Sequence, residues 1–124
     1  DYTPIISTVG LDSKYNAFNI NADDVATGVA RALKASKLVF LTDIEGVLRN
    51  PSDPSTRISV INTESAAELF EQGIITGGMI PKLKNCLEAV QEDVKKVHIL
   101  DGRLEHSLLI EIFTTSGVGT EIKK

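Results

Sequence analysis

The sequence is poor in cysteine and in aromatic residues, with one cysteine, no tryptophan and 5% aromatics. A single cysteine excludes a disulfide within the chain and agrees with a reducing compartment. No apolar run reaches the roughly 20 residues that a membrane-spanning helix needs, and the opening DYTPIISTVG has neither the basic nor the apolar region of a secretory signal. We therefore expect a cytoplasmic protein without a membrane span.

Positive charge is also scarce, because 17 acidic residues outnumber 13 lysines and arginines and leave a formal net charge of −4. Nucleic-acid surfaces usually need a basic face that displaces counterions, so we expect no nucleic-acid partner. His98 and His106 have no cysteines or H-E-x-x-H pattern beside them, so we expect no metal site built by the protein. Walker A and G-x-S-x-G patterns are absent, which argues against a P-loop NTPase and a serine hydrolase.

The hydrophobic content of 42% over 124 residues suits one compact domain spanning residues 1–124. Hydrophobic periodicity and end signals predict helices over Asp23–Lys34, Thr63–Gln72, Ile80–Val90 and Glu105–Phe113. Short apolar runs predict strands over Pro4–Leu11, Lys37–Thr42, Ile58–Ile61, Val97–Leu100 and Val118–Ile122. This alternation predicts an α/β fold, a three-layer αβα sandwich with a largely parallel central sheet.

Three features refine this expectation. Lys37–Thr42 is apolar between polar ends, which favours a central strand covered on both faces. Asp43–Arg57 is rich in Gly, Pro, Asn, Ser and Asp, which indicates a turn and an exposed loop or hairpin. Cys86 falls on the apolar side of the third helix, so we expect a buried free thiol.

The segment TDIEGVL, Thr42–Leu48, follows a predicted buried strand. Ligands of such sheets gather at the carboxyl ends of the strands, where Asp43 and Gly46 could hold a ribose or a base edge. The alternative is an ordinary strand exit in which Asp43 only forms the turn. This segment alone leaves both interpretations open.

A second segment, IITGGMIPK, places Gly77 and Gly78 before a helix and Lys82 in its first turn. Glycines allow close approach to a ligand, and the helix adds its N-terminal amides, so a phosphate would make the position of the lysine favourable. In the alternative, the glycines form a hinge, Pro81 is a favoured first-turn residue and Lys82 is a solvated surface lysine.

A third segment, NINADD, opens the first helix. Asn and Asp are preferred helix caps, and capping explains one or two of these four polar residues. In a functional interpretation, an asparagine amide holds a substrate carboxylate and Asp23 pairs with lysines around a phosphoryl group.

In their order and spacing, NINADDVA, LVFLTDIEGVL, EQGIITGGMIPK and HILDGRLEHSLLIEIFTTSGVGTEI resemble the C-terminal half of the acetylglutamate kinases, members of the amino acid kinase family. The resemblance implies transfer of the γ-phosphoryl group of ATP, with Mg²⁺, to the side-chain carboxylate of N-acetyl-L-glutamate in arginine biosynthesis. It also implies that the family's N-terminal substrate-binding half is absent, so the chain alone binds ATP weakly without catalysing the transfer. The parent protein is expected to be a homo-oligomer.

The resemblance assigns roles to matching residues. Asp23 would orient the catalytic lysines, Lys82 would stabilise the phosphoryl transition state, and Asn19 would bind the acetylglutamate carboxylate. The residues expected around the nucleotide are Thr42, Asp43, Ile44, Glu45, Gly46, Val47, Leu48, Ile74, Ile75, Thr76, Gly78 and Met79. Because the acceptor is already a carboxylate, positioning and charge neutralisation would dominate the chemistry.

The C-terminal segment resembles that of members inhibited by arginine, which implies an effector site at His98, Glu111 and Gly117. In the alternative, His98 is a buried histidine and Glu111 only decorates a helix. Two other functions stay open. One is a non-catalytic domain that senses arginine or binds a protein, and the other is a kinase for N-acetyl-aminoadipate, whose acceptor is one methylene longer.

Overall fold

The computed structural model describes residues 2–115 and 117–124. The helices are α1 (Ala22–Ala32), α2 (Thr63–Glu71), α3 (Met79–Gln91) and α4 (Ser107–Phe113), with a 3₁₀ turn at Pro54–Thr56. The strands are β1 (Val9–Leu11), β2 (Ala17–Asn19), β3 (Leu38–Thr42), β4 (Val60–Ile61), β5 (Val97–Asp101) and β6 (Thr120–Ile122). The four predicted helices and the last four predicted strands are thereby confirmed. None of the helices in the described ranges has the length and apolar character needed to cross a membrane.

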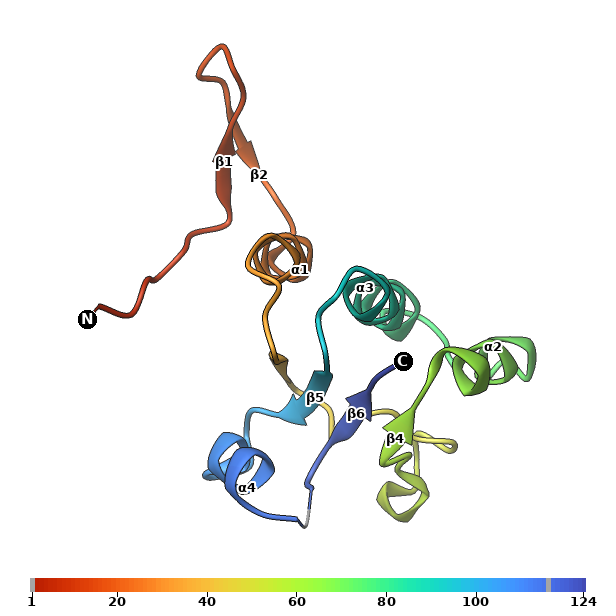
Figure 1. The fold of residues 1–124 in the computed structure, drawn as a ribbon. Coiled ribbons are helices and arrows are strands. Elements are labelled where there is room, and N and C mark those ends of the chain that lie inside the picture. The colour runs from red at the N-terminus through yellow and green to blue at the C-terminus, as the bar shows by residue number, and fades with distance from the viewer. Residues whose placement is uncertain (1, 116) are drawn as a thin grey trace.

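Four of the strands form one sheet in the order β3-β5-β6-β4. β3 is parallel to β5 and β4 is parallel to β6, whereas β5 and β6 are antiparallel. The helices α1 and α3 lie together on one face of the sheet, and α4 lies on the other face (Figure 1). The predicted α/β sandwich with a largely parallel sheet is confirmed.

The core lies between the sheet and the helix pair α1 and α3. β5 is buried along its whole length, which fits a strand with neighbours on both edges and helices on both faces. Leu83 and Cys86 of α3 pack against this strand and are fully buried. Burial raises the pKa of the Cys86 thiol to about 12, so the predicted buried free thiol is confirmed.

The strand predicted to be central, β3, is instead an edge strand, because among the described residues it pairs only with β5. Leu41 is 57% exposed, so one face of β3 is also open, contrary to the prediction. The prediction was wrong because a continuous apolar run indicates a strand but does not define its position in the sheet order. The central positions belong to β5 and β6.

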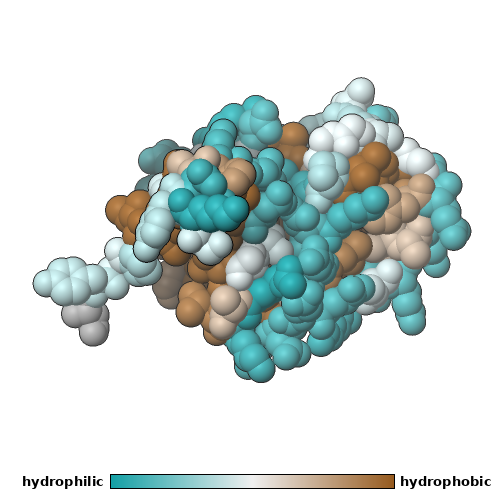
Figure 2. Space-filling view, turned by 90° about the horizontal axis from the view of Figure 1, so that it is seen from above, coloured by the Kyte–Doolittle hydropathy of each residue, from teal (hydrophilic) through white to brown (hydrophobic). Residues whose placement is uncertain are grey.

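The predicted first strand was also only partly right, because only Val9–Leu11 forms a strand and it lies outside the main sheet. It pairs antiparallel with β2, a strand that the sequence pattern did not reveal, and the hairpin projects from the body of the molecule (Figure 1). Figure 2 shows apolar residues at the surface beside the N-terminal segment. Within that segment, Ile5 and Ile6 are exposed.

Candidate functional site

The first turns of α1 and α3 bring Asp23 and Lys82 together. Asn21 caps α1, and its side chain accepts a hydrogen bond from the Asp23 amide at 2.9 Å. Lys82 Nζ donates to Asp23 Oδ2 at 2.5 Å, and the two side chains are 20% and 30% exposed. In this segment Asn21 therefore caps the helix, while Asp23 pairs with a lysine as the functional interpretation predicted.

Further polar contacts fix α1 against α3 along their length. Asn85 Nδ2 donates to Asp24 Oδ1 at 2.7 Å, one turn beyond the Asp23–Lys82 pair. Arg31 pairs with Glu88 at 2.7 Å and with Glu92 at 2.5 Å. These contacts connect the same two helices that carry Asp23 and Lys82.

A cavity of about 210 Å³ lies between the turn after β3 and the start of α3. It is lined by Ile44, Gly46, Val47, Leu48, Pro51, Ile74, Ile75, Thr76 and Met79. Eight of these nine residues belong to the predicted nucleotide set, and Pro51 was missed. The cavity is smaller than the ~300–1,000 Å³ of pockets that enclose a whole drug-sized ligand, so it can take one part of a nucleotide, such as the base.

The other four predicted nucleotide residues, Thr42, Asp43, Glu45 and Gly78, lie beside this cavity in the chain but do not line it. Thr42 shapes the turn, since its hydroxyl accepts a hydrogen bond from the Ile44 amide at 3.2 Å. Gly78 precedes the first residue of α3 and offers no side-chain cap to the helix. Asp43 is exposed on the turn.

Gly46 and Thr120 lock the turn in place. Gly46 has φ of +120°, and a Cβ built there would lie 2.6 Å from Thr120 Oγ1. Thr120 Oγ1 accepts a hydrogen bond from the Val47 amide at 2.9 Å and donates to the Ile58 carbonyl at 2.7 Å. Sequence reasoning missed Thr120, since no local pattern marks a contact across 73 positions.

Gly77 and Gly78 lie in a turn that is closed by its own backbone hydrogen bonds. Gly77 has φ of +53°, a conformation that favours glycine. The amides of Met79 and Ile80 donate to the Thr76 and Gly77 carbonyls at 3.1 and 3.2 Å. These two amides are therefore occupied inside the turn, and a phosphate at this helix start would depend more on Lys82.

Asn19 lies in β2 of the projecting hairpin rather than in α1. It lines a separate cavity of about 530 Å³ together with Asn21 and Asp24. The structure thus places Asn19 near the start of α1, beside Asp24 rather than at the Asp23–Lys82 pair.

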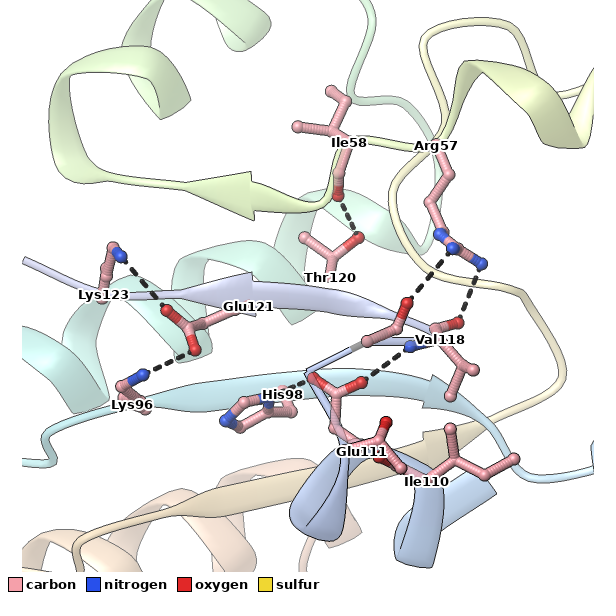
Figure 3. Close-up of polar contacts among 12 residues, drawn as sticks. Arg57, Ile58, Lys96, His98, Ile110, Glu111, Val118, Thr120, Glu121 and Lys123 are labelled. Atoms are coloured by element: carbon pink, nitrogen blue, oxygen red, sulfur yellow. Dashed lines mark hydrogen bonds and ion pairs between the residues drawn. The ribbon is translucent and has the colours of Figure 1, made fainter. Parts of the chain in front are cut away.

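A larger polar cavity of about 590 Å³ lies at the other end of the sheet, between β5, β6 and α4. His98, Glu111 and Gly117 all line it, as do Lys37, Lys96 and Glu121. The residues that form hydrogen bonds around it lie on β5, β6, α4 and the loop before β6 (Figure 3). Hydrogen bonds from Lys96 and Lys123 lower the pKa of Glu121, although burial acts to raise it.

His98 and Glu111 form a buried pair in this cavity. Glu111 Oε1 lies 2.7 Å from His98 Nδ1, and Oε2 accepts a hydrogen bond from the Val118 amide at 2.9 Å. The two side chains are only 4% and 8% exposed. His98 Nε2 is buried and has no hydrogen-bond partner among the described residues. In a neutral ring that donates Nδ1–H to Glu111, Nε2 is an acceptor.

The loop that closes this cavity is held from outside by Arg57. Its guanidinium donates to the Val118 carbonyl at 2.9 Å and to the Gly117 carbonyl at 3.4 Å (Figure 3). A Cβ on Gly117 would lie 3.2 Å from Glu111 Oε2. Arg57 therefore anchors the Gly117 and Val118 carbonyls beside the cavity.

Curated relatives match the chain over nearly its whole length. The acetylglutamate kinase of Methanosphaera stadtmanae is 50% identical over 100% of this chain and 42% of the relative. The acetylglutamate kinase of Persephonella marina is 53% identical over 98% of this chain and 40% of the relative. The chain therefore spans about two fifths of the length of these relatives, and the resemblance to acetylglutamate kinases is confirmed.

Solved structures give the same fold. An N-acetylglutamate synthase from Neisseria gonorrhoeae, solved with coenzyme A and L-arginine, superposes with a TM-score of 0.86 at 31% identity, over 96% of this chain and 27% of that chain. A carbamate kinase from Giardia lamblia, bound to AMP-PNP, superposes with a TM-score of 0.68 at 23% identity, over 94% of this chain and 41% of that chain, and supports the fold alone. The model of the amino acid kinase family matches residues 1–101. With this match over most of its length, the chain belongs to the amino acid kinase family.

Proposed function

We propose that the chain is the nucleotide-binding part of an acetylglutamate kinase, which transfers the γ-phosphoryl group of ATP to the side-chain carboxylate of N-acetyl-L-glutamate. The observation that carries this proposal is the ion pair between Asp23 at the start of α1 and Lys82 at the start of α3. The first residue of α3, Met79, also lines the 210 Å³ cavity. The identity to acetylglutamate kinases over the whole chain supports the substrate assignment and a place in arginine biosynthesis.

The chemistry asks for charge neutralisation rather than a covalent intermediate. An oxygen of the acceptor carboxylate attacks the γ-phosphorus, the bond from the γ-phosphorus to its bridging oxygen breaks, and ADP leaves with that electron pair. Lys82 offsets the negative charge that gathers on the phosphoryl oxygens, and Asp23 orients the ammonium group. No general base is required, because the acceptor is already ionised.

Magnesium is proposed as the companion of ATP. The described residues contain no group of three potential metal ligands, and kinases commonly hold Mg²⁺ through phosphate oxygens and one or two carboxylates. The exposed carboxylate of Asp43, beside the nucleotide cavity, fits such a sparse ligand set. The ion would reduce the charge of the phosphates when bound.

This chain spans about two fifths of the length of its acetylglutamate kinase relatives. The acceptor and the assembly are therefore proposed for a protein of the relatives' full length. We propose N-acetyl-L-glutamate as the acceptor and a homo-oligomer as the assembly. The acceptor one methylene longer, N-acetyl-aminoadipate, is the alternative. An apolar pocket discriminates one methylene by only ~1–3 kcal/mol, so rates with both acceptors decide between them.

The test of the nucleotide site is calorimetric titration of the chain with ATP and Mg²⁺. We expect binding, and we expect Lys82→Met to weaken it by about tenfold or more, because a hydrogen bond to a charged group is lost. Lys84→Met on the exposed side of the same helix is the matched control and should bind like the parent chain. Absence of ATP binding, or equal affinities of the two variants, would refute the proposal.

We also propose arginine as a ligand of the 590 Å³ cavity. The buried acceptor His98 Nε2 suits a guanidinium N–H, and the L-arginine complex of the gonococcal synthase gives independent support. Both carboxylate oxygens of Glu111 already accept hydrogen bonds, so its part is to hold the His98 ring in the acceptor tautomer.

Titration with L-arginine tests this second site. His98→Asn keeps a donor for Glu111 but removes the acceptor at Nε2, so arginine binding should fall about tenfold or more. His106→Asn at an exposed position is the control. A chain that bound no arginine would refute the second proposal, and one that bound arginine but not ATP would favour a non-catalytic sensing domain.

A further inference from the structure

We propose that Phe40 is a positioning residue, whose ring holds the Lys82 ammonium group ready for a nucleotide phosphate. This inference rests on the proposed phosphoryl transfer and adds a residue to its site. Phe40 lies in the middle of β3, two residues before the end of the strand that leads to the nucleotide cavity.

The geometry is that of a cation–π contact. Lys82 Nζ lies over the Phe40 ring, 5.2 Å from the ring centroid. A cation within about 6 Å of an aromatic centroid is attracted by the negative face of the ring, and the attraction grows as water is excluded. Phe40 is 5% exposed, so water is excluded from most of the ring.

The ring itself cannot move far. Phe40 pairs with Ile99 in the parallel register of β3 and β5, and it belongs to the buried core cluster. Lys82 approaches the ring from α3, which packs on the sheet and shares the core cluster with Phe40. The ammonium group is thus held between a rigid aromatic floor and the Asp23 carboxylate.

The combination of one carboxylate and one ring has a chemical consequence. An ammonium group has three N–H donors, and the Asp23 carboxylate accepts from one of them. The ring attracts the charge without neutralising it, whereas a second carboxylate at that position would make the cluster negative and repel phosphate. Phe40 therefore stabilises the ammonium group while leaving it able to donate to a phosphate oxygen.

The contact also restricts the lysine. A lysine side chain has a flexible four-carbon stem, and fixing it on ligand binding costs rotamer entropy. With Nζ already placed over the ring, part of that cost is met before the nucleotide arrives. Weakening the contact should then weaken ATP binding, although Phe40 itself does not touch the nucleotide.

Fluorinated phenylalanines at position 40 test this inference without emptying the core. Fluorine withdraws electron density from the ring face with little change of shape, so ATP affinity should fall stepwise from one to five fluorines. The expected total loss is between about two- and tenfold, the range of a partly exposed cation–π contact. The same series at Phe70, a partly buried aromatic residue of α2, is the matched control and should leave affinity unchanged.

Repeating the series in a Lys82→Met background separates positioning from packing. The stepwise loss should vanish there, because no cation remains over the ring. A flat or rising affinity series at Phe40, or an unchanged series without Lys82, would overturn the inference.

A measurement that needs no nucleotide keeps the two proposals apart. In the parent chain, the ε-methylene protons of Lys82 should show an upfield ring-current shift by NMR, and Phe40→Leu should abolish it. If the chain bound no ATP, the proposed function would fail, and this shift alone would decide whether Phe40 places the lysine. Absence of the shift would overturn the inference by itself.

Discussion

Thr120 and Val47 link the last described strand to the turn after β3, since Thr120 Oγ1 in β6 accepts a hydrogen bond from the Val47 amide at 2.9 Å. The same hydroxyl donates to the Ile58 carbonyl at 2.7 Å. One buried side chain therefore ties the turn after β3 to the last strand and to the segment before β4. Loss of this hydroxyl would affect the stability of the domain and the shape of the cavity together.

We predict that Thr120→Val destabilises the domain by about 1–3 kcal/mol, because the nearly isosteric valine leaves a buried amide and a carbonyl without their partner. Urea unfolding measures this cost. Thr120→Ser keeps the hydroxyl and is the matched control, expected to lose less stability than Thr120→Val. A loss in Thr120→Ser as large as or larger than that in Thr120→Val would contradict the role of the hydroxyl, because only Thr120→Val removes it.

Two glycine-to-alanine substitutions should change the stability of the domain in opposite directions. Gly46→Ala places a Cβ 2.6 Å from Thr120 Oγ1 on a backbone with φ of +120°, so it should cost at least ~1–3 kcal/mol. Gly28→Ala in α1 meets nothing within 4 Å and should stabilise the domain by roughly 0.5–1 kcal/mol through helix propensity. Thermal unfolding of both variants checks the prediction, and a stabilising Gly46→Ala would contradict the described turn.

The Cys86 thiol should make stability fall at high pH. Burial raises its pKa in the folded chain from the ordinary 9.0 to about 12, so between these values the unfolded chain loses a proton that the folded chain keeps. The unfolded state is then favoured as pH rises, by at most ~1.4 kcal/mol per pH unit. Chemical unfolding from pH 8 upward should show a steeper decline for the parent chain than for Cys86→Ala. Parallel declines would contradict the buried thiol.

Arg31 should stabilise the α1–α3 pair by about 1 kcal/mol, because it contacts two glutamates at once while staying partly exposed. Arg31→Met should lose this stability, and the loss should shrink at high salt because the pairs are screened. Lys34→Met is the control, since Lys34 approaches Asp93 only to 3.8 Å in open solvent. Urea unfolding at low and high ionic strength measures both variants, and a salt-independent loss at Arg31 would point to lost packing instead.

The parts of the fold that could be predicted are those with local causes. The helices follow from apolar spacing and caps such as Asn21. Local pattern pointed to Gly46 after the strand exit, whereas the resemblance to the acetylglutamate kinases supplied most of the other cavity residues. The position of β3 at the sheet edge could not be predicted, because strand order depends on pairing between distant segments. Asn19 was placed at a helix start for the same reason, since its strand exists only through pairing with β1.

The contacts that complete the candidate site were equally hidden. Phe40 reads as one apolar residue among several in its strand, and only the packing of α3 on the sheet brings Lys82 over it. The segment NINADD suggested that Asp23 pairs with lysines, and the resemblance then gave Lys82 its role. Geometry then added the fact that a ring lies beneath the ammonium group.

The uncovered edge of β3 has a practical consequence for work with this chain. No other described strand pairs with the backbone along the outer edge of β3. The exposed side chain of Leu41 in the same strand adds apolar surface. Such an edge is a template for strand addition between molecules, so concentrated solutions should form intermolecular β-structure. Ligand titrations are best made in dilute samples, and a lysine in place of Leu41 would improve solubility without altering the Asp23–Lys82 pair.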